Sequence, residues 1–214
     1  MGVSDAHIRA RAHACAELAI ALGTCLKEII RPSSAVEQLI AARLGDSRAP
    51  LLGVHVRVTM SKEDGAGGDT QIGPSSTIPL RRQGQAMIVL TAISLLRSSP
   101  DGTKLFVATD NAAMRDNLAT HPLLAPHVLA PAPTAPIVHS ARERGLEAQL
   151  MMAADWWTLA RSSQLVLTRQ STFGYIAAGA AGVVPYTVHE HKVERRFHCG
   201  PFALCDLHPA DCGV

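Results

Sequence analysis

The sequence predicts an α/β protein in which a parallel sheet carries helices on both faces. Short apolar, β-branched segments alternate along the chain with stretches that have helical periodicity, which is typical of parallel strands joined by crossover helices. Hydrophobic residues make up 47% of the 214 residues, so a sizeable core can form. Charged residues make up only 18%, which argues against disorder.

The N-terminal part of the chain is predicted to be helical. Apolar residues recur at helical spacing from Asp5 to Ile30, and Pro32 ends this segment. A second helix is predicted over Ala35–Arg43, with Ser33 or Ser34 as its N-cap.

Four segments have the composition of buried strands. Each is short, rich in Val, Leu or Ile, and bounded by Gly, Pro or polar turn residues. The first is continuously apolar at its start and is therefore expected at the centre of the sheet. The four segments are Leu51–Val58, Lys104–Thr109, Gln164–Thr168 and Val183–Val188.

Helices are predicted between and before these strands. Three of them cover Leu80–Arg97, Ala141–Arg161 and Thr172–Ala181. A fourth is capped by Asp110 or Asn111 and ends at Leu118. The stretch Thr59–Pro79 is polar and glycine-rich, and it is long enough to be a functional or mobile loop. The Pro/Ala-rich stretch Pro122–Pro136 is expected to be extended, and the chain after His189 to be irregular.

Several classes of protein are disfavoured by composition. A formal net charge of +2 is too balanced for a nucleic-acid polyelectrolyte binder, although it allows a local phosphate site. No apolar run approaches the ~20 residues that span a bilayer, and the N-terminus does not have the pattern of a secretory signal. The dinucleotide fingerprint G-x-G-x-x-G, the Walker loop and the G-x-S-x-G elbow are missing from the sequence.

The five cysteines allow three interpretations. Cys199, Cys205 and Cys212 lie close together near the C-terminus, whereas Cys15 and Cys25 lie in the predicted first helix. A disulfide among the last three is favoured. A zinc site is weakly supported because the sequence has no C-x-x-C pair, and free cysteines remain open. Clustered acidic ligands are also missing, so no divalent metal ion is implied.

The end of the first strand carries His55 and Arg57. Residues two apart on a strand point to the same face, so both side chains are expected to project together. An arginine fork at this place suits the bidentate binding of a phosphate. The alternative is structural: an arginine paired with a carboxylate and a histidine bonded within the core.

Two further clusters follow strands, where open α/β sheets bind their ligands. Thr109, Asp110 and Asn111 follow the second strand and are most simply explained as a helix cap. After the third strand, Ser171-Thr172-Phe173-Gly174 starts a small-residue helix, whose free amide groups and positive end could bind an anion. The structural alternative is again an N-cap.

Asp155 stands in the predicted helix before the third strand, next to Trp156 and Trp157. A buried carboxylate needs donors, and the N1–H and N2–H edge of guanine would supply a pair of them. The alternative is a salt bridge at the surface.

The segment QLVLTRQSTFGYIAAGAAGVVPY, together with the cysteine-containing tail, resembles the C-terminal motif of plant xyloglucan-type α1,2-fucosyltransferases. LLGVHVRV resembles the arginine-bearing strand of the wider fucosyltransferase superfamily, which reads H-x-R in the α1,6- and protein O-fucosyltransferases. KLFVATDNAAM and RPSSAVEQLIAARLG resemble the superfamily's A-T-D segment and the helix before the arginine strand.

This resemblance implies the donor-binding half of a GT-B glycosyltransferase that acts in the Golgi. The donor would be GDP-fucose and the acceptor a glycan hydroxyl, with neither metal nor cofactor. The implied organisation is helices over 1–45, a Rossmann-like nucleotide-sugar-binding domain over 46–190, and an irregular tail over 191–214. No membrane contact is expected of this chain itself.

The resemblance also implies roles for individual residues. Arg57 would be the catalytic residue that holds the β-phosphate, Ser171 and Thr172 would bind the diphosphate, and Phe173 would shape their turn. His55 would lie near the guanine and Asp155 would pair with it.

The general base is not assigned. Glu63, Asp64 and Asp69 follow the arginine strand and are candidates. Two other functions remain open: a non-catalytic module that binds a GDP-sugar, and an unrelated α/β interaction domain in which Arg57 and Asp155 pair with each other.

Overall fold

The computed structural model describes residues 17, 19–45, 48–57, 77–129, 145–169, 171–189 and 192–196. Its centre is one five-stranded sheet with the strand order β2-β1-β3-β4-β5. The first four strands are parallel, and β5 is antiparallel to β4. The strands are β1 (Leu51–Val56), β2 (Lys104–Thr109), β3 (Gln164–Thr168), β4 (Tyr186–His189) and β5 (Lys192–Arg195). The predicted fold class, a mostly parallel α/β sheet, is confirmed.

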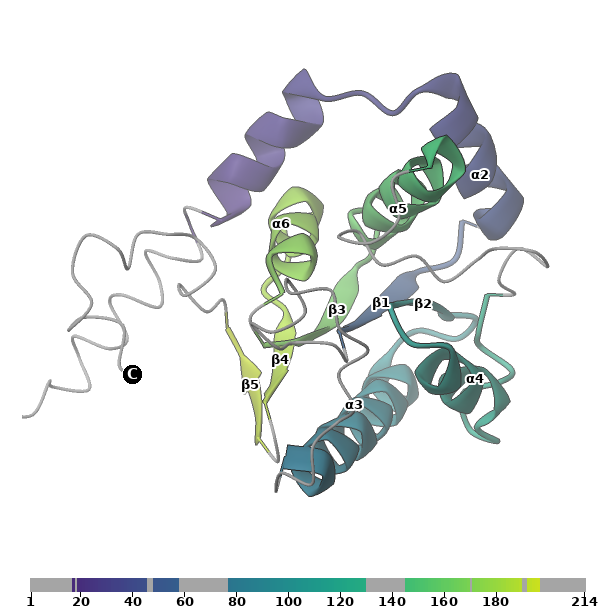
Figure 1. Cartoon of the computed structure of the whole chain (residues 1–214), viewed down its shortest axis with the longest axis vertical. Coiled ribbons are helices and arrows are strands. Elements are labelled where there is room, and N and C mark those ends of the chain that lie inside the picture. Colours follow the sequence, from purple (N-terminus) through teal and green to yellow (C-terminus); the bar gives the residue numbers. More distant parts are fainter. Residues whose placement is uncertain are drawn as a thin grey trace, which may run out of the picture.

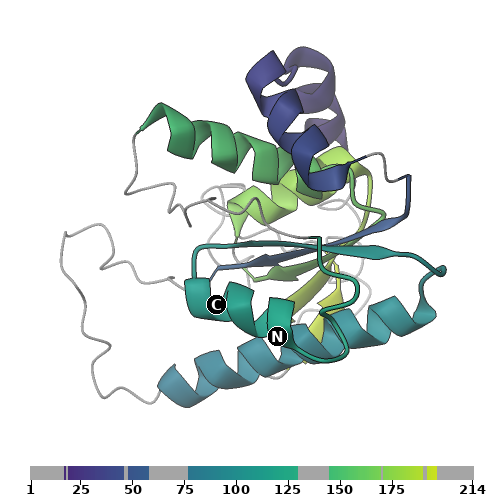
Figure 2. The same cartoon turned by 90° about the vertical axis from the view of Figure 1, so that its right-hand side faces the viewer.

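Helices cover both faces of the sheet, as the two side views show (Figures 1 and 2). On one face lie α3 (Thr77–Ser98) and α4 (Ala112–Thr120). On the other lie α2 (Ser34–Leu44), α5 (Leu146–Leu159) and α6 (Thr172–Ala181), together with a further helical stretch over 19–29. No described helix is both long enough and apolar enough to cross a membrane.

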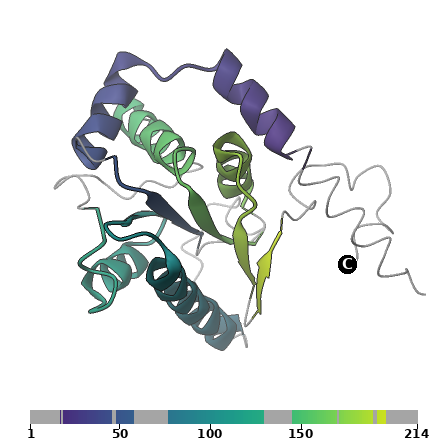
Figure 3. The same cartoon turned by 180° about the vertical axis from the view of Figure 1, so that it is seen from behind.

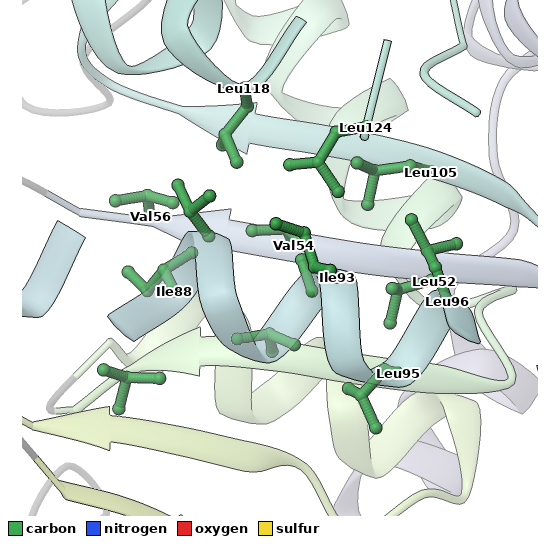
Figure 4. Packing of buried hydrophobic residues seen from close by; sticks show 14 of the residues in the cluster. Leu52, Val54, Val56, Ile88, Ile93, Leu95, Leu96, Leu105, Leu118 and Leu124 are labelled. Atoms are coloured by element: carbon green, nitrogen blue, oxygen red, sulfur yellow. The ribbon is translucent and has the colours of Figure 1, made fainter. Parts of the chain in front are cut away.

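The larger core lies between the sheet and α3. Leu52, Val54 and Val56 alternate along β1 toward this face, and Ile88 and Ile93 of α3 pack against them (Figure 4). Burying side chains of this size contributes about 1.5–3 kcal/mol each, so this layer is a main source of stability. The intervening residues of β1 face the opposite layer, and this alternation is what aims His55 at α6.

The predictions for the start of the fourth strand and for the stretch after Pro122 are wrong. The fourth strand begins at Tyr186, not at Val183. Gly182 adopts a left-handed φ of 71° as the C-cap of α6, and the Val183 N–H returns to the Ala178 carbonyl, so Val183 completes the helix end. The stretch predicted to be extended from Pro122 instead forms hydrogen-bonded turns over 122–127.

The chain after His189 was expected to be irregular, but residues 192–195 form β5 at the edge of the sheet (Figure 3). Its sequence, KVER, is mostly charged. Charged residues on an edge strand discourage pairing with other chains. They also explain why the sequence does not indicate this strand, since strands are predicted from apolar composition.

The helical stretch 19–29 crosses α6 at glycines. A Cβ on Gly179 would overlap the Ala19 carbonyl, and a Cβ on Gly23 would overlap the Ala180 backbone nitrogen. The two helix backbones are therefore in direct contact. Figure 1 shows this stretch in purple beside α6.

Substituting Gly179→Ala is expected to separate these two helices. Alanine in place of glycine inside a helix normally stabilises by about 1 kcal/mol, but here the new methyl meets backbone that cannot rotate away. We expect a loss of roughly 1–3 kcal/mol in the free energy of unfolding and faster amide exchange over 19–29. Gly145→Ala is the control, because a Cβ there would meet no atom of the described residues within 4 Å. A stabilised Gly179→Ala variant would contradict the close crossing.

Candidate functional site

The strand order creates a reversal point between β1 and β3. The chain leaves β1 toward β2 on one side of the sheet and leaves β3 toward β4 on the other side. Connections that diverge in this way open a crevice at the carboxyl ends of the two strands, which is where open α/β sheets bind their ligands. The H-x-R segment ends β1 and the S-T-F-G segment follows β3, so the two predicted clusters lie at this same place.

A hydrogen bond joins the ends of these two strands. The backbone N–H of Arg57 donates to Oγ1 of Thr168 over 3.0 Å. Because the backbone makes this bond, the strand ends stay joined whatever the side chain at position 57. The Arg57 residue is half-buried at this edge.

The start of α6 is built by a serine cap. Ser171 is fully buried, and its hydroxyl oxygen accepts from the Gly174 N–H over 3.3 Å. The Ser171 hydroxyl is therefore used as the N-cap of α6, which is the structural alternative given for this segment. Thr172 is exposed and Phe173 half-buried, so a ligand approaching the helix from outside would meet these two residues first.

His55 packs against this first turn of α6. Its ring centroid lies 5.3 Å from that of Phe173, with 32° between the ring planes. A Cβ on Gly174 would stand 3.2 Å from His55 Nδ1 and 3.0 Å from a methyl of Leu167, so glycine is what permits this approach. The contact brings the two predicted clusters together in space.

His55 is held in its neutral form. The residue is 8% exposed, and its burial lowers the pKa of the imidazole to about 4. The Asp110 carboxylate raises the pKa and the Arg57 guanidinium lowers it, but burial has the largest effect. Nδ1 is buried, and no described residue forms a hydrogen bond with it.

The cluster after β2 is mainly a helix cap. The Asn111 side chain accepts from the Met114 N–H over 2.9 Å, and the Asn111 N–H donates to Oγ1 of Thr109 over 3.2 Å. This confirms capping by Asn111 in preference to Asp110. Asp110 instead contributes its negative charge to the surroundings of His55.

Asp155 forms a salt bridge, the structural alternative named above, with a partner that the sequence did not indicate. One carboxylate oxygen lies 2.7 Å from Nη2 of Arg43, whose side chain is only 6% exposed. Burial raises the pKa of Asp155 to about 6, and Arg43 opposes this rise. The suggestion that Asp155 pairs with Arg57 is wrong, because its partner is Arg43.

Arg43 is the residue that sequence reasoning missed. Its guanidinium lies 5.6 Å from the ring centroid of Phe106, and Nη2 lies 3.9 Å from Sδ of Met151. A cation in the last turn of a helix is ordinary, so nothing in the local sequence marks Arg43 as buried.

Among known proteins, the similarity found is to solved structures and is distant. No family model matches the chain, and no curated protein matches it. Among solved structures, a crystal structure of NodZ α-1,6-fucosyltransferase soaked with GDP-fucose matches with a TM-score of 0.41 and 23% sequence identity. The match covers 69% of this chain and 42% of that one, so this chain spans less than half of that protein's length. A likeness this distant shows neither the family nor the substrate of this chain.

Other predicted features fall partly outside the described residues. These include the base candidates Glu63, Asp64 and Asp69 and the cysteines other than Cys25, which is free and exposed. Within the described ranges, no group of three or more His, Cys, Asp or Glu side chains is arranged to hold a metal ion.

Proposed function

We propose that this chain binds GDP-fucose at the carboxyl ends of β1 and β3 and forms the donor-binding half of an inverting fucosyltransferase. The observation that carries the proposal is the contact of His55 with Phe173 and Gly174, which unites the H-x-R and S-T-F-G segments at the reversal point of the sheet. These two segments carry the sequence resemblance. Their meeting is what a shared diphosphate site requires.

Arg57 and the start of α6 would hold the diphosphate. The guanidinium offers paired N–H donors that match phosphate oxygens, and the first amides of α6 add donors at the positive end of a ten-residue helix. Because Ser171 is buried in its cap, the amides of Thr172 and Phe173 are the groups we assign to the phosphate.

These groups would also promote the reaction. When an acceptor hydroxyl of a glycan attacks the anomeric carbon, the bond to GDP breaks and negative charge builds on the β-phosphate oxygen. Donors already aimed at that oxygen stabilise the transition state more than the ground state. Arg57 would supply the positive charge that a metal ion supplies in other transferases.

His55 and Asp155 would contact the nucleoside. His55 lies beside the first turn of α6, next to the proposed phosphate position. Asp155 would accept from the N1–H and N2–H groups of guanine while one of its oxygens stays paired with Arg43. The remaining expectations from the resemblance, namely a glycan acceptor and a Golgi location, belong to this same proposal.

Arg57→Ala tests the phosphate role. We expect calorimetry to show GDP binding weakened by roughly 10- to 100-fold, because charge-assisted bonds contribute about 1.5–3 kcal/mol. The backbone bond to Thr168 survives the substitution, so the fold should persist. Arg97→Ala is the matched control, because Arg97 is an exposed arginine in the last turn of α3. Unchanged GDP affinity in a folded Arg57→Ala variant would refute the proposal.

Thermal shift with GDP, ADP and UDP tests the ligand class, since a ligand specific for the folded state raises the melting temperature. Stabilisation by GDP alone supports the proposal. Stabilisation by none of the three would favour an α/β interaction domain. Binding of GDP-fucose without transfer to an added glycan would favour a non-catalytic module and overturn the transferase part.

A further inference from the structure

The surroundings of His55 Nδ1 determine which ring nitrogen of this side chain carries the proton. Nδ1 is buried without a hydrogen-bond partner in the part of the chain that the structure describes, and it lies against Gly174, the third residue of α6. The α6 segment has ten residues and begins at the Ser171 cap, so its first turn presents the positive end of the helix to this nitrogen.

A proton on Nδ1 would be unfavourable at this place. It would create a buried N–H donor for which no described group is an acceptor, beside the first turn at the positive end of α6. An unprotonated Nδ1 instead turns a lone pair toward that positive end. A neutral imidazole carries one proton, which must then be on Nε2.

The charged groups around His55 do not reverse this preference. Arg57 at the end of β1 disfavours a positive imidazole, and Asp110 after β2 favours it. The contacts from β3 and α6 come from Leu167, Phe173 and Gly174, which carry no charge. Burial outweighs the single carboxylate.

We propose that the first turn of α6 holds His55 as the neutral Nε2–H tautomer, so that this residue offers an uncharged hydrogen-bond donor to an acceptor oxygen of the ligand. Gly174 is the positioning residue, because any side chain there would press on Nδ1. The tautomer depends on geometry alone, whereas its use in ligand binding rests on the proposed function.

Nitrogen NMR of the ligand-free protein tests the tautomer. With ¹⁵N-labelled histidine, and His55→Gln to assign the signal, we expect an acceptor-type shift at Nδ1 and a donor-type shift at Nε2, unchanged from pH 8 to pH 5. Gly174→Ala should alter these shifts, while Gly145→Ala should not. A proton on Nδ1, or protonation of both nitrogens above pH 5, would overturn the proposal.

Two substitutions test the use of the donor. Glutamine places an N–H near the position of Nε2, whereas asparagine places it near Nδ1. We expect His55→Asn to bind GDP about 5- to 10-fold more weakly than His55→Gln does, as for one neutral hydrogen bond. Equal losses would overturn the donor role.

Pyrophosphate in place of GDP identifies the acceptor oxygen. If His55→Asn weakens both ligands, a phosphate oxygen is the acceptor; if it weakens GDP alone, the oxygen belongs to the nucleoside. Either result supports the donor. Failure of GDP to bind the unsubstituted protein would refute the proposed function while leaving the NMR result intact.

Discussion

Replacing Asp155 with leucine is expected to lower the free energy of unfolding by about 3–5 kcal/mol. The substitution removes the partner of Arg43, whose side chain is 6% exposed. A buried guanidinium without its counter-ion then lies between α2, α5 and the ring of Phe106.

Urea denaturation at pH 7 measures this loss. Glu37→Ala is the control, because it breaks an ion pair of similar length, 3.0 Å to Arg161, between side chains that are 47% and 40% exposed. Exposed pairs contribute about 0–1 kcal/mol, so this control should change little. Equal effects of Asp155→Leu and Glu37→Ala would contradict a buried pair.

The reciprocal variant should behave differently with pH. Arg43→Met leaves a carboxyl that can take up a proton, so its cost should shrink as the pH falls toward 5, whereas the cost of Asp155→Leu should not. The double variant Arg43→Met/Asp155→Leu should recover most of the lost stability, because neither charge remains buried.

Stability should fall on acidification because of His55, by an amount on the order of 3 kcal/mol between pH 7 and pH 4. Its folded-state pKa of about 4 lies below the ordinary value of 6.5, so the unfolded chain binds more protons in this interval. The contribution is therefore present above pH 6.5 and is lost as the pH falls through 4.

Asp155 acts in the opposite direction. Its pKa is raised from 3.8 to about 6, so its contribution is present below pH 3.8 and is lost as the pH rises through 6. Because its side chain keeps 32% exposure, we expect the smaller slope from this group. The two slopes partly cancel in the unsubstituted protein.

Comparing the protein with its His55→Gln variant isolates the histidine, since Asp155 is present in both. The difference in unfolding free energy, measured by urea titrations at several pH values, should change steadily between pH 6.5 and pH 4 and be flat above pH 7. A flat difference throughout would show that His55 titrates normally in the folded protein.

Local patterns were sufficient wherever neighbouring residues decide the structure. Lys104–Thr109, Gln164–Thr168 and Thr172–Ala181 form elements with the predicted bounds, and Ser33 caps α2 as one of the two serines considered. Strand composition and cap chemistry act within a few residues, so the sequence displays them directly.

Only part of the candidate site could be predicted from the sequence. The resemblance indicated His55, Arg57 and Ser171–Phe173. The rule that ligands bind at the carboxyl ends of parallel strands indicated the edge of the sheet where they lie. The contact between His55 and Gly174 depends on β1 and β3 being neighbours, and no local pattern specifies strand order.

The sequence by itself determined the alternation of strands and helices, the helix caps, and the residue types at the ends of β1 and β3. The tertiary structure alone decided that β1 and β3 lie side by side, that Arg43 neutralises Asp155, and that KVER forms an edge strand. Propensity and capping energies arise between near neighbours in the chain, whereas strand pairing, burial and ion pairing arise between segments that only folding brings together.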